Sequence, residues 1–540
     1  MAPPSPSHLH GIVDMGSNGI RFSISDLSPP TARSLPTVFQ SRLGVSLYDA
    51  QYSNPSNPHL RIPIPQSTID SVVEALLRFK ITCSDFGVPE SNIQVLATEA
   101  TRTAINSVEF RDQIREATGW RVQMLAKEME GRIGAMGVAS SFQGVQGLVM
   151  DLGGGSTQLT WLSSHAGTIQ TDPQGSISFP YGAAALMRQL SYLKSHDPGG
   201  SAAHASLASE MQTSFRAAYA SLSIPSALQT SAAQNGGYTL YLSGGGFRGW
   251  GYLLMSQAQP NPYPIPLING FRVSKSDFQS VTRIQEIAAQ SSSSSSADKH
   301  GEESIFRVSK RRAAQVPAVA FLVNVLCLAI PEIAEIRFCQ GGVREGVLFQ
   351  SLDAETRALD PLSAASAKLG SASAGEIADL LADALPLNNN NSSSSSSSSN
   401  KGNHNRSGKQ ELEHTSLAKE SASLAALYAP LTGVLASAHA VSHPQRAMLA
   451  LMLCQRWSGE LAPPHGSLRD RLRQLLGRDE VWWCSYLGSV AALVADVYPA
   501  GRVERGRERV AFNASWGAGM GKKGVDEGVR LAVCTREGGM

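Results

Sequence analysis

The sequence has little charge and no clustered cysteines. Charged residues make up only 17 % of its 540 positions, and the formal net charge is +2. This balance offers no basic footprint for nucleic acid and no acidic tail, so we expect no nucleic-acid partner. The six cysteines form no Cys-x-x-Cys pair. Their scatter argues against the common zinc and disulfide frameworks and indicates reduced thiols in a cytoplasmic protein.

Long hydrophobic runs are also absent. The most apolar stretch, Val316 to Ile330, contains Asn324 and is shorter than the roughly 20 residues that span a bilayer. It therefore predicts a buried helix. The first residues, Met1 to His8, lack the apolar region of a signal peptide. We expect no membrane partner.

Two polar tracts interrupt the chain. One lies near 291–303 and includes a serine run, and the other, 388–410, is rich in serine and asparagine. Such tracts have no apolar side chains to offset the entropy lost on ordering. Both predict disordered insertions at the surface.

Three domains are expected along the rest of the sequence. Segments 1–135 and 136–352 each mix strand-like and helix-like stretches, which predicts α/β layers. Segment 353–540 has long apolar-periodic runs at 444–457 and 480–497 and predicts a mainly helical domain. Its Gly-rich end predicts short strands or loop. The strands predicted in the α/β segments include 11–14, 20–24, 93–97, 147–151, 158–162 and 239–243.

The most informative feature is a local pattern that occurs twice. Ile12 to Phe22 is IVDMGSNGIRF, and Val149 to Leu159 is VMDLGGGSTQL. Each copy is an apolar strand that reaches an aspartate, Asp14 or Asp151, followed by a turn of glycine and hydroxyl residues and a second apolar strand. The repeat predicts two similar hairpins in the two α/β segments.

The residue types in these turns suit a phosphate ligand. Glycine lets backbone N–H groups approach an anion, hydroxyl groups add donors, and aspartate oxygens hold Mg²⁺ or its water. A single Gly-rich hairpin is usually an ordinary turn. Two copies of the pattern, each with an aspartate at the same position, favour the interpretation that the two hairpins close around one polyanion. Two further Gly-rich turns, at Ser243 to Phe247 and Cys339 to Gly346, follow apolar stretches and are not specific alone.

Five motifs resemble those of the exopolyphosphatase/guanosine-pentaphosphatase (Ppx/GppA) phosphatase family and occur in the same order along the chain. Two are the Asp-Gly turns described above. The other three are Ala97 to Arg102, Glu130 to Val138 and Gly342 to Gly346. The similarity covers roughly residues 8 to 350. The insertions and the long helical end look most like a fungal regulatory branch of that family.

The resemblance implies a fold and a chemistry. The fold is two ribonuclease-H-like domains of the actin-like ATPase superfamily around a cleft, here with the helical C-terminal domain added. The chemistry is Mg²⁺-dependent hydrolysis of a terminal phosphoanhydride. By position, Glu130 is the general base, Arg102 neutralises the transferring phosphoryl group, and Asp14 and Asp151 hold the metal. The residues expected to line the phosphate or nucleotide are Gly16, Ser17, Asn18, Arg21, Gly153, Gly154, Gly155, Ser156, Thr157, Gly244, Gly245 and Gly246.

Three positions depart from the family pattern. Gln158 stands where the family usually has a glutamate that assists the metal, and an amide binds Mg²⁺ more weakly than a carboxylate. Gly19 replaces a serine, and Met129 replaces a glutamate before Glu130. These differences argue against catalytic turnover, but they are compatible with phosphate binding.

Simpler interpretations stay open for the two catalytic candidates. Glu130 lies in the charged stretch Lys127 to Arg132, and spacing alone favours a solvated helix face for it. Only its place between the two Asp-Gly turns supports the catalytic role. Arg102 fits a salt-bridge partner.

Three functions compete. We favour a phosphate- or nucleotide-binding regulator with weak or no hydrolysis, which the resemblance places in mitochondria-to-nucleus retrograde signalling with cytosolic regulatory proteins as partners. The alternative is an active Mg²⁺-dependent exopolyphosphatase or guanosine pentaphosphate phosphohydrolase. The ligand is polyphosphate, a guanosine polyphosphate or ATP in either case. A small-molecule kinase would need an acceptor pocket that the sequence does not reveal. Whether the protein is an enzyme and whether it forms a homodimer stay open.

Overall fold

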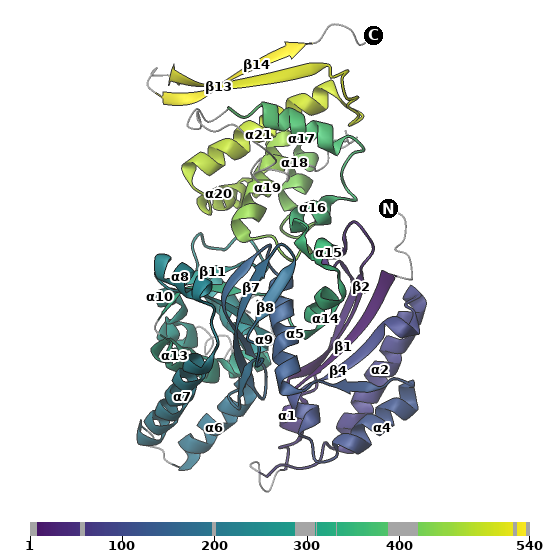
Figure 1. The fold of residues 1–540 in the computed structure, drawn as a ribbon, viewed down its shortest axis with the longest axis vertical. Coiled ribbons are helices and arrows are strands. Elements are labelled where there is room, and N and C mark those ends of the chain that lie inside the picture. Colours follow the sequence, from purple (N-terminus) through teal and green to yellow (C-terminus); the bar gives the residue numbers. More distant parts are fainter. Residues whose placement is uncertain are drawn as a thin grey trace. The chain divides into compact units, whose positions relative to one another are not determined.

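The computed structural model describes residues 8–54, 60–196, 201–286, 308, 310–330, 332–386, 419–521 and 526–535 (Figure 1). The insertions predicted at 291–303 and 388–410 lie outside these ranges. The chain separates into two compact units. The first consists of 1–263, 267–361 and 437–442, and the second of 264–266, 362–436 and 443–540.

The first unit begins with a five-stranded sheet in the order β3-β2-β1-β4-β5. β1 pairs antiparallel with β2 and parallel with β4. Val13 and Met15 of β1 contribute to one core, together with Phe79 of α2, while Ile12 contributes to another. β1 is therefore buried on both faces, as expected of a central strand with an apolar sequence. The strands are β1 (Leu9–Gly16), β2 (Gly19–Asp26), β3 (Thr37–Leu43), β4 (Ile93–Ala97) and β5 (Val122–Met124).

A second sheet repeats this arrangement. Its main order is β11-β12-β10-β6-β7-β8, and β9 also pairs with β7. β6 pairs antiparallel with β7 and parallel with β10, as β1 does with β2 and β4. The strands are β6 (Val145–Leu152), β7 (Thr157–His165), β8 (Thr168–Thr171), β9 (Ile177–Phe179), β10 (Tyr238–Ser243), β11 (Arg272–Ser274) and β12 (Ile333–Phe338). We call the two sheets with their outer helices the first and second lobes.

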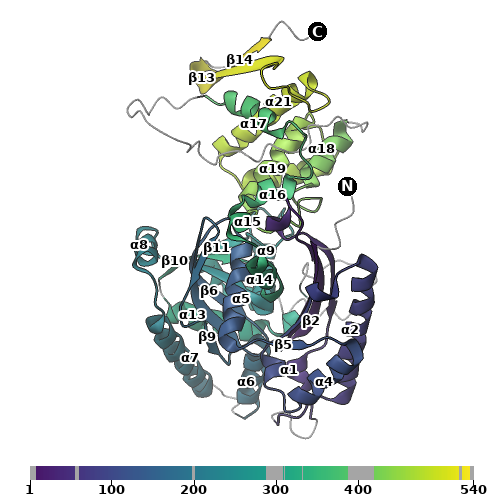
Figure 2. The same cartoon turned by 45° about the vertical axis from the view of Figure 1, so that its right-hand side comes forward.

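Two helices lie between the sheets, and Figures 1 and 2 both show α5 (Lys127–Ser140) and α14 (Val343–Ser351) in this position. They bury Ile133 and Val138 of α5 and Leu348 of α14 together with Ile12 of the first sheet and Val149 of the second. One apolar core therefore joins the two lobes.

The outer helices cover each sheet. α13 (Val316–Ala329) is the buried helix that the apolar stretch predicted, and Leu322, Val323 and Leu326 are fully buried. None of the helices in the described ranges is long and apolar enough to cross a bilayer. The other helical segments of this unit are α1 (Leu47–Ala50), α2 (Gln66–Phe86), α3 (Glu99–Arg102), α4 (Ser107–Thr118), α6 (Ala183–His196), α7 (Ser201–Ser221), α8 (Ser226–Gln234), α9 (Gly244–Gln257), α10 (Lys275–Phe278), α12 (Lys310–Ala314) and α15 (Ala354–Ala358), with short 3-10 turns at Ala32–Ser34 and Glu90–Asn92.

The second unit is mainly helical, as predicted, and ends in a β-hairpin. Its core joins Leu380, Val490 and Val494 to Phe512 of the hairpin. The elements are α16 (Pro361–Ser366), α17 (Ala374–Asp383), α18 (Lys419–Tyr428), α19 (His443–Arg456), α20 (His465–Gln474), α21 (Arg478–Val497), β13 (Val510–Met520) and β14 (Asp526–Thr535).

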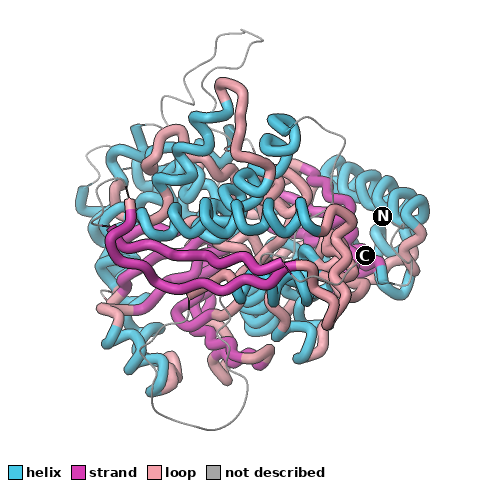
Figure 3. The backbone as a smooth tube through the Cα atoms, turned by 90° about the horizontal axis from the view of Figure 1, so that it is seen from above, coloured by secondary structure: helices cyan, strands magenta, loops and turns pink. Residues whose placement is uncertain are grey.

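The terminal strands differ from the expected short strands or loop. β13 and β14 have 11 and 10 residues and run side by side, as Figure 3 shows. Val510 and Phe512 alternate toward the helices while Asn513 and Ser515 do not share that core. Glycines interrupt the alternation of apolar residues in this segment, so the sequence alone did not predict long strands. Packing of the hairpin on α17 and α21 stabilises the strands instead.

Candidate functional site

Both aspartate-tipped hairpins line one hollow of the first unit, which we call the central pocket. Asp14 stands opposite Arg21 and Asp151 stands opposite Gln158 in the registers of the two sheets. The turns that follow Asp14 and Asp151 both line this hollow, so the two copies of the repeated pattern face each other across the lobes. The predicted site residues that line the central pocket are Asp14, Gly16, Ser17, Asn18, Arg21, Glu130, Asp151, Gly153, Gly154, Ser156, Gly244, Gly245 and Gly246.

The turns of the two hairpins approach each other closely. A Cβ atom on Gly154 would lie 2.8 Å from Asn18 Cγ and 2.9 Å from Ser17 Cβ, so a side chain at this position has no room. Asn18 Nδ2 also donates to Gln315 Oε1 across the lobes at 3.3 Å. The central pocket has a volume of about 110 Å³, well below the roughly 300–1,000 Å³ of most small-molecule sites. In this arrangement it has room for phosphoryl groups and water but not for a whole nucleotide.

Arginines surround one side of the central pocket. Arg21, Arg42, Arg248 and Arg312 all line it. Burial, with Arg21 and Arg312 nearby, lowers the pKa of Arg248 to about 9. Burial, with Arg21 and Arg42 nearby, lowers the pKa of Arg312 to about 10. Both remain protonated at neutral pH, and their mutual repulsion would be relieved by an anion between them.

Arg248 is held in place by the third Gly-rich turn. Its Nε donates to the carbonyl of Gly244 at 3.2 Å, and its Nη1 donates to the carbonyl of Gln340 at 3.1 Å. Both acceptors are neutral carbonyls, so the guanidinium keeps its positive charge for a ligand. A signal for this residue was present in the sequence, because Arg248 lies two positions after Gly246 of the Gly-rich turn.

Three carboxyl groups face these arginines. Burial raises the pKa of Asp14, although Arg21 lies 4.0 Å away and opposes the shift. The Ser243 hydroxyl donates to Asp151 Oδ2. Burial also raises the pKa of Glu130 to about 7; Arg102 opposes the shift and Asp151 adds to it. Acidic and basic groups therefore converge in one small space, as a metal–polyphosphate site requires.

Magnesium fits this donor set only if the ligand brings further oxygens. Among the described residues, no three His, Cys, Asp or Glu side chains form a group that could hold a metal by themselves. Mg²⁺ typically takes one or two protein carboxylates and completes its shell with water and substrate phosphates. Asp14 and Asp151 share the central pocket; burial is the main cause of the raised pKa of Asp14, and the charge of Asp151 adds to it slightly. The residues present thus suit a metal that binds together with a phosphate chain.

Three predicted site residues do not line the central pocket. Arg102 instead points at Glu130, with Nη1 and Nη2 at 3.3 and 3.4 Å from Glu130 Oε2. The Thr157 hydroxyl is buried and donates to the carbonyl of Tyr181 at 2.9 Å. Gly155 accepts a hydrogen bond from the backbone of Gly182. These three positions shape the site rather than face its ligand.

Two of the three departures from the family pattern reshape the central pocket. Gln158 Nε2 donates to Ser156 Oγ at 2.8 Å, which leaves the hydroxyl hydrogen of Ser156 available for an anion. Gly19 has φ +152°, and a Cβ there would lie 3.0 Å from Arg42 Nε. Arg42 Nη2 donates to the carbonyl of Asn18 at 3.1 Å. A guanidinium therefore occupies the space beside the turn where a serine side chain would have stood.

The third departure, Met129, does not face the central pocket. Its side chain is 42 % exposed and lines a separate hollow with Arg132, Trp161 and Asp172. The absence of a glutamate at this position therefore has no direct effect on the residues that line the central pocket.

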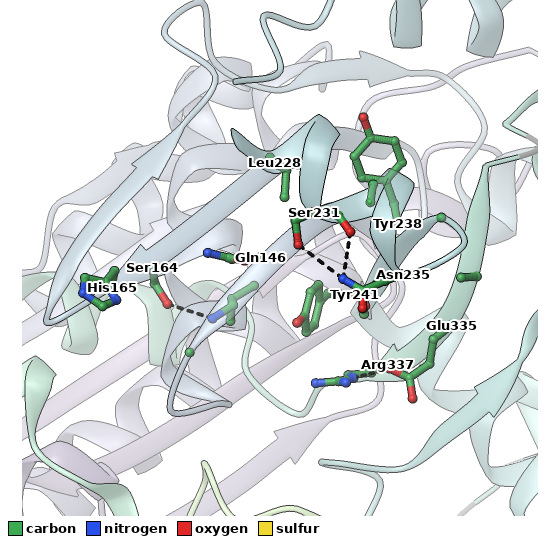
Figure 4. Close-up of a pocket in the computed structure, with 16 residues that line it drawn as sticks. Gln146, Ser164, His165, Leu228, Ser231, Asn235, Tyr238, Tyr241, Glu335 and Arg337 are labelled. Atoms are coloured by element: carbon green, nitrogen blue, oxygen red, sulfur yellow. Dashed lines mark hydrogen bonds and ion pairs between the residues drawn. The ribbon is translucent and has the colours of Figure 1, made fainter. Parts of the chain in front are cut away.

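Another hollow lies at the opposite, amino-terminal edge of the second sheet (Figure 4). Its volume is about 630 Å³. Several of the polar groups in it have protein partners: Ser164 Oγ accepts from the backbone N–H of Val145, Asn235 Nδ2 donates to the carbonyl of Ser231, and Arg337 Nε lies 2.6 Å from Glu335 Oε2. These bonds indicate structural roles, so we place the candidate site at the central pocket.

Comparison with known proteins assigns the family. Residues 28–355 match the Ppx/GppA phosphatase family, and residues 360–539 match the RTG2 C-terminal domain. The chain belongs to the Ppx/GppA family. It is 37 % identical over 505 residues to retrograde regulation protein 2 of Saccharomyces cerevisiae, which covers 92 % of this chain and 82 % of the yeast protein. The match to the Ppx/GppA family begins after the first hairpin, whose position opposite the second is visible in the structure.

Solved structures of Ppx/GppA proteins are similar at lower identity. A family member from Aquifex aeolicus is 20 % identical with a TM-score of 0.46, covering 63 % of this chain and 96 % of that one. An exopolyphosphatase from Cytophaga hutchinsonii is 17 % identical with a TM-score of 0.46, covering 64 % and 99 %. Family membership and the repeated sheet topology confirm the predicted actin-like fold of two α/β domains with a distinct C-terminal domain.

Proposed function

We propose that this protein binds a phosphate chain with Mg²⁺ between its lobes and acts as a regulator in mitochondria-to-nucleus retrograde signalling, with weak or no hydrolysis. The observation that carries the proposal is the central pocket, where two aspartate-tipped hairpins and four arginines of the described residues converge. The name of the yeast relative supports the regulatory role. A cytoplasmic location and cytosolic regulatory partners belong to the same proposal.

The charge pattern of the central pocket favours a phosphate chain over a neutral ligand. Arg21 and Arg312 add to the burial that lowers the pKa of Arg248, and Arg21 and Arg42 add to the burial that lowers the pKa of Arg312. Charge-assisted hydrogen bonds from guanidinium groups to phosphate are among the strong ones in proteins. Asp14 and Asp151 would repel the same phosphates unless a divalent cation lay between them.

A second function, hydrolysis of the terminal phosphoanhydride, is favoured by Glu130. A general base works best when its pKa is near the working pH, and the pKa of Glu130 is about 7. In that case Glu130 takes a proton from water as the water oxygen bonds to the terminal phosphorus, the bridging P–O bond breaks, and the shortened phosphate chain leaves. The arginines neutralise the charge that develops on the phosphoryl oxygens. Bound Mg²⁺ would neutralise further charge on the chain. Arg102 orients Glu130 through its contacts to Oε2.

One experiment separates the two functions. Calorimetry with tripolyphosphate, with and without Mg²⁺, is combined with a phosphate-release assay on wild type and Glu130→Gln. We expect Mg²⁺-dependent binding and a release rate that does not depend on Glu130. Release that disappears in Glu130→Gln would instead establish the hydrolase.

A surface variant tests the site without touching the core. Arg42 is exposed and donates to the first turn, so Arg42→Ala should weaken tripolyphosphate binding roughly tenfold through the loss of one charge-assisted bond. Arg78→Ala, on the exposed face of α2, is the matched control. Failure of wild type to bind tripolyphosphate would reject the proposal.

A further inference from the structure

A short stretch of the C-terminal region belongs to the first unit. Residues 437–442 have stretches of the second unit on both sides in the sequence, but they are part of the first unit. We call them the inserted segment. Ala438, His439 and Val441 of this segment are buried. A connection usually runs over the surface, because the backbone of a buried one needs hydrogen-bond partners inside the protein.

One buried side chain supplies such a partner. Asn269 Nδ2 donates to the carbonyl of His439. The same Nδ2 donates to the carbonyl of Ser141, directly after α5, at 3.1 Å. Asn269 Oδ1 accepts from the backbone N–H of Gln340 at 2.9 Å. Asn269, which is 3 % exposed, therefore joins the inserted segment to α5 and to the loop that leads into α14.

That loop, residues 339–342, extends to the central pocket, and we call it the α14 loop. Its Gln340 carbonyl accepts from Arg248 Nη1 at 3.1 Å, and Arg248 lines the central pocket. Gly342 of the same loop lines it as well. The backbone at Gln340 thus connects Asn269 on one side with Arg248 on the other.

A second connection to the central pocket runs through Glu345. Its Oε2 accepts from the backbone N–H of Gly342 at 2.9 Å, and its Oε1 lies 3.3 Å from Arg344 Nη2. Burial alone would raise the pKa of this carboxyl, but Arg344, His439 and Arg248 outweigh it and lower the pKa to about 2. Glu345 is therefore ionised near both the inserted segment and an arginine of the central pocket. A phosphate bound at Arg248 would compete with Glu345 for the same positive charge.

The inserted segment is closely tied to α19 of the second unit. α19 begins at His443, directly after the segment. Arg446 of this helix is 1 % exposed, and its Nη1 donates to the carbonyls of Pro430 at 2.6 Å and Leu435 at 3.1 Å, both of which precede the segment. The chain before the segment and the helix after it are thus bonded to each other, so a displacement of the segment acts on α19.

We propose that the inserted segment couples occupancy of the central pocket to the second unit. The inference rests on the proposed function and adds a route by which that site regulates the rest of the chain. A ligand at Arg248 stabilises the α14 loop, and Asn269 and Glu345 hold the inserted segment against that loop. A ligand that favours the held segment over a locally opened one shifts the population toward it. Asn269 and His439 are positioning residues, because neither lines the central pocket.

Hydrogen exchange on the full chain measures this coupling. Tripolyphosphate with Mg²⁺ should slow amide exchange in peptides that cover 437–450 roughly fivefold or more, at the lower end of typical couplings between two sites. Exchange in the β13–β14 hairpin should not change, because the hairpin packs on α17 and α21. Calorimetry on the same sample measures binding itself.

Variants of the positioning residues test the route. Asn269→Asp keeps the acceptor for Gln340 but loses both donors, so the slowing at 437–450 should disappear. Tripolyphosphate affinity should fall several-fold with it, because coupling between two sites is reciprocal. His439→Ala removes only the imidazole near Glu345 and should reduce the slowing, which keeps the test decisive if Asn269→Asp does not fold. Ser437→Ala, an exposed position of the same segment, is the matched control and should behave as wild type.

The outcomes separate this inference from the proposed function. Tripolyphosphate that binds wild type without slowing exchange at 437–450 would overturn the inference and leave the proposed function standing. Full slowing in folded Asn269→Asp, or in His439→Ala, would also overturn it, because the inserted segment would then not transmit the effect of the ligand. Wild type that does not bind tripolyphosphate would reject both.

Discussion

The two aspartate-tipped hairpins share a sequence pattern but surround their carboxylates differently. Asp14 has Arg21 opposite it in the sheet, 4.0 Å away. Asp151 has the neutral Gln158 in the corresponding place and accepts a hydrogen bond from Ser243 of the neighbouring strand. One carboxylate is thus partly neutralised by its own hairpin, and the other is oriented by a hydroxyl group. We therefore expect Asp151 to contribute more than Asp14 to the Mg²⁺-dependent binding that we propose.

The glycines of the two turns also serve different ends. Gly19 makes room for Arg42, which then reaches the first turn. Gly154 makes room for the opposite lobe, because Ser17 and Asn18 lie against it. The absence of a side chain therefore leaves space for the Arg42 guanidinium in the first turn and lets the two turns approach each other at Gly154.

The largest expected effect comes from breaking the aspartate pair. Asp151→Asn should weaken Mg²⁺-dependent tripolyphosphate binding roughly 100-fold, within the roughly 2–5 kcal/mol that losing one partner of a buried charge contact costs. Asp14→Asn should cost roughly tenfold, because Arg21 already offsets part of its charge. Calorimetry at fixed Mg²⁺ measures both. Asp112→Asn, on the exposed part of α4, is the control. Equal losses at the two sites would show that Arg21 makes no difference.

The next effect concerns Glu130, which lies near Asp151. Its pKa is raised from the usual 4.5 to about 7, chiefly by burial. The folded chain therefore keeps a proton that the unfolded chain releases between about pH 4.5 and 7, and stability falls as pH rises through that window. Between pH 5 and 8 the wild type should lose about 2 kcal/mol more than Glu130→Gln.

Urea unfolding at several pH values measures this loss. Asp151→Asn should narrow the window, because the charge of Asp151 helps to raise the pKa of Glu130. Asp14→Asn should narrow this pH window less than Asp151→Asn does. Parallel stability curves for wild type and Glu130→Gln would show that Glu130 titrates normally.

The smallest effect tests how closely the turns must approach. Gly154→Ala places a methyl group within 3 Å of the first turn and should weaken tripolyphosphate binding roughly tenfold, because overpacking of this kind typically costs about 1–3 kcal/mol. Gly134→Ala, on α5, is the matched control, since a Cβ there would have no neighbour within 4 Å and Gly134 does not line the central pocket. Calorimetry and thermal unfolding distinguish a closure defect from loss of folding. Identical behaviour of the two variants would mean that contact between the turns has no role in binding.

Part of this site was visible in the sequence and part was not. The strands at 11–14 and 147–151 and the apolar helix after Gln315 follow from local patterns, and the structure contains them as β1, β6 and α13. Arg42 and Arg312 escaped prediction because no motif surrounds them. Arg42 reaches the central pocket from β3, which pairs with the first hairpin, and Arg312 reaches it from α12, far from both hairpins in the sequence. The long β13–β14 hairpin escaped because its glycines weaken the alternation of apolar residues.

The amino-acid sequence by itself determined the two hairpins, their aspartates and their Gly-rich turns, because alternation and turn chemistry act over a few neighbouring residues. Tertiary structure alone decided that the turns meet, that Arg102 pairs with Glu130, and that Met129 faces away from the central pocket. Those features depend on how α5 and α14 bring two sheets together around one apolar core. Burial around the central pocket is then the main cause of the raised pKa of Glu130 and of the lowered pKa values of Arg248 and Arg312.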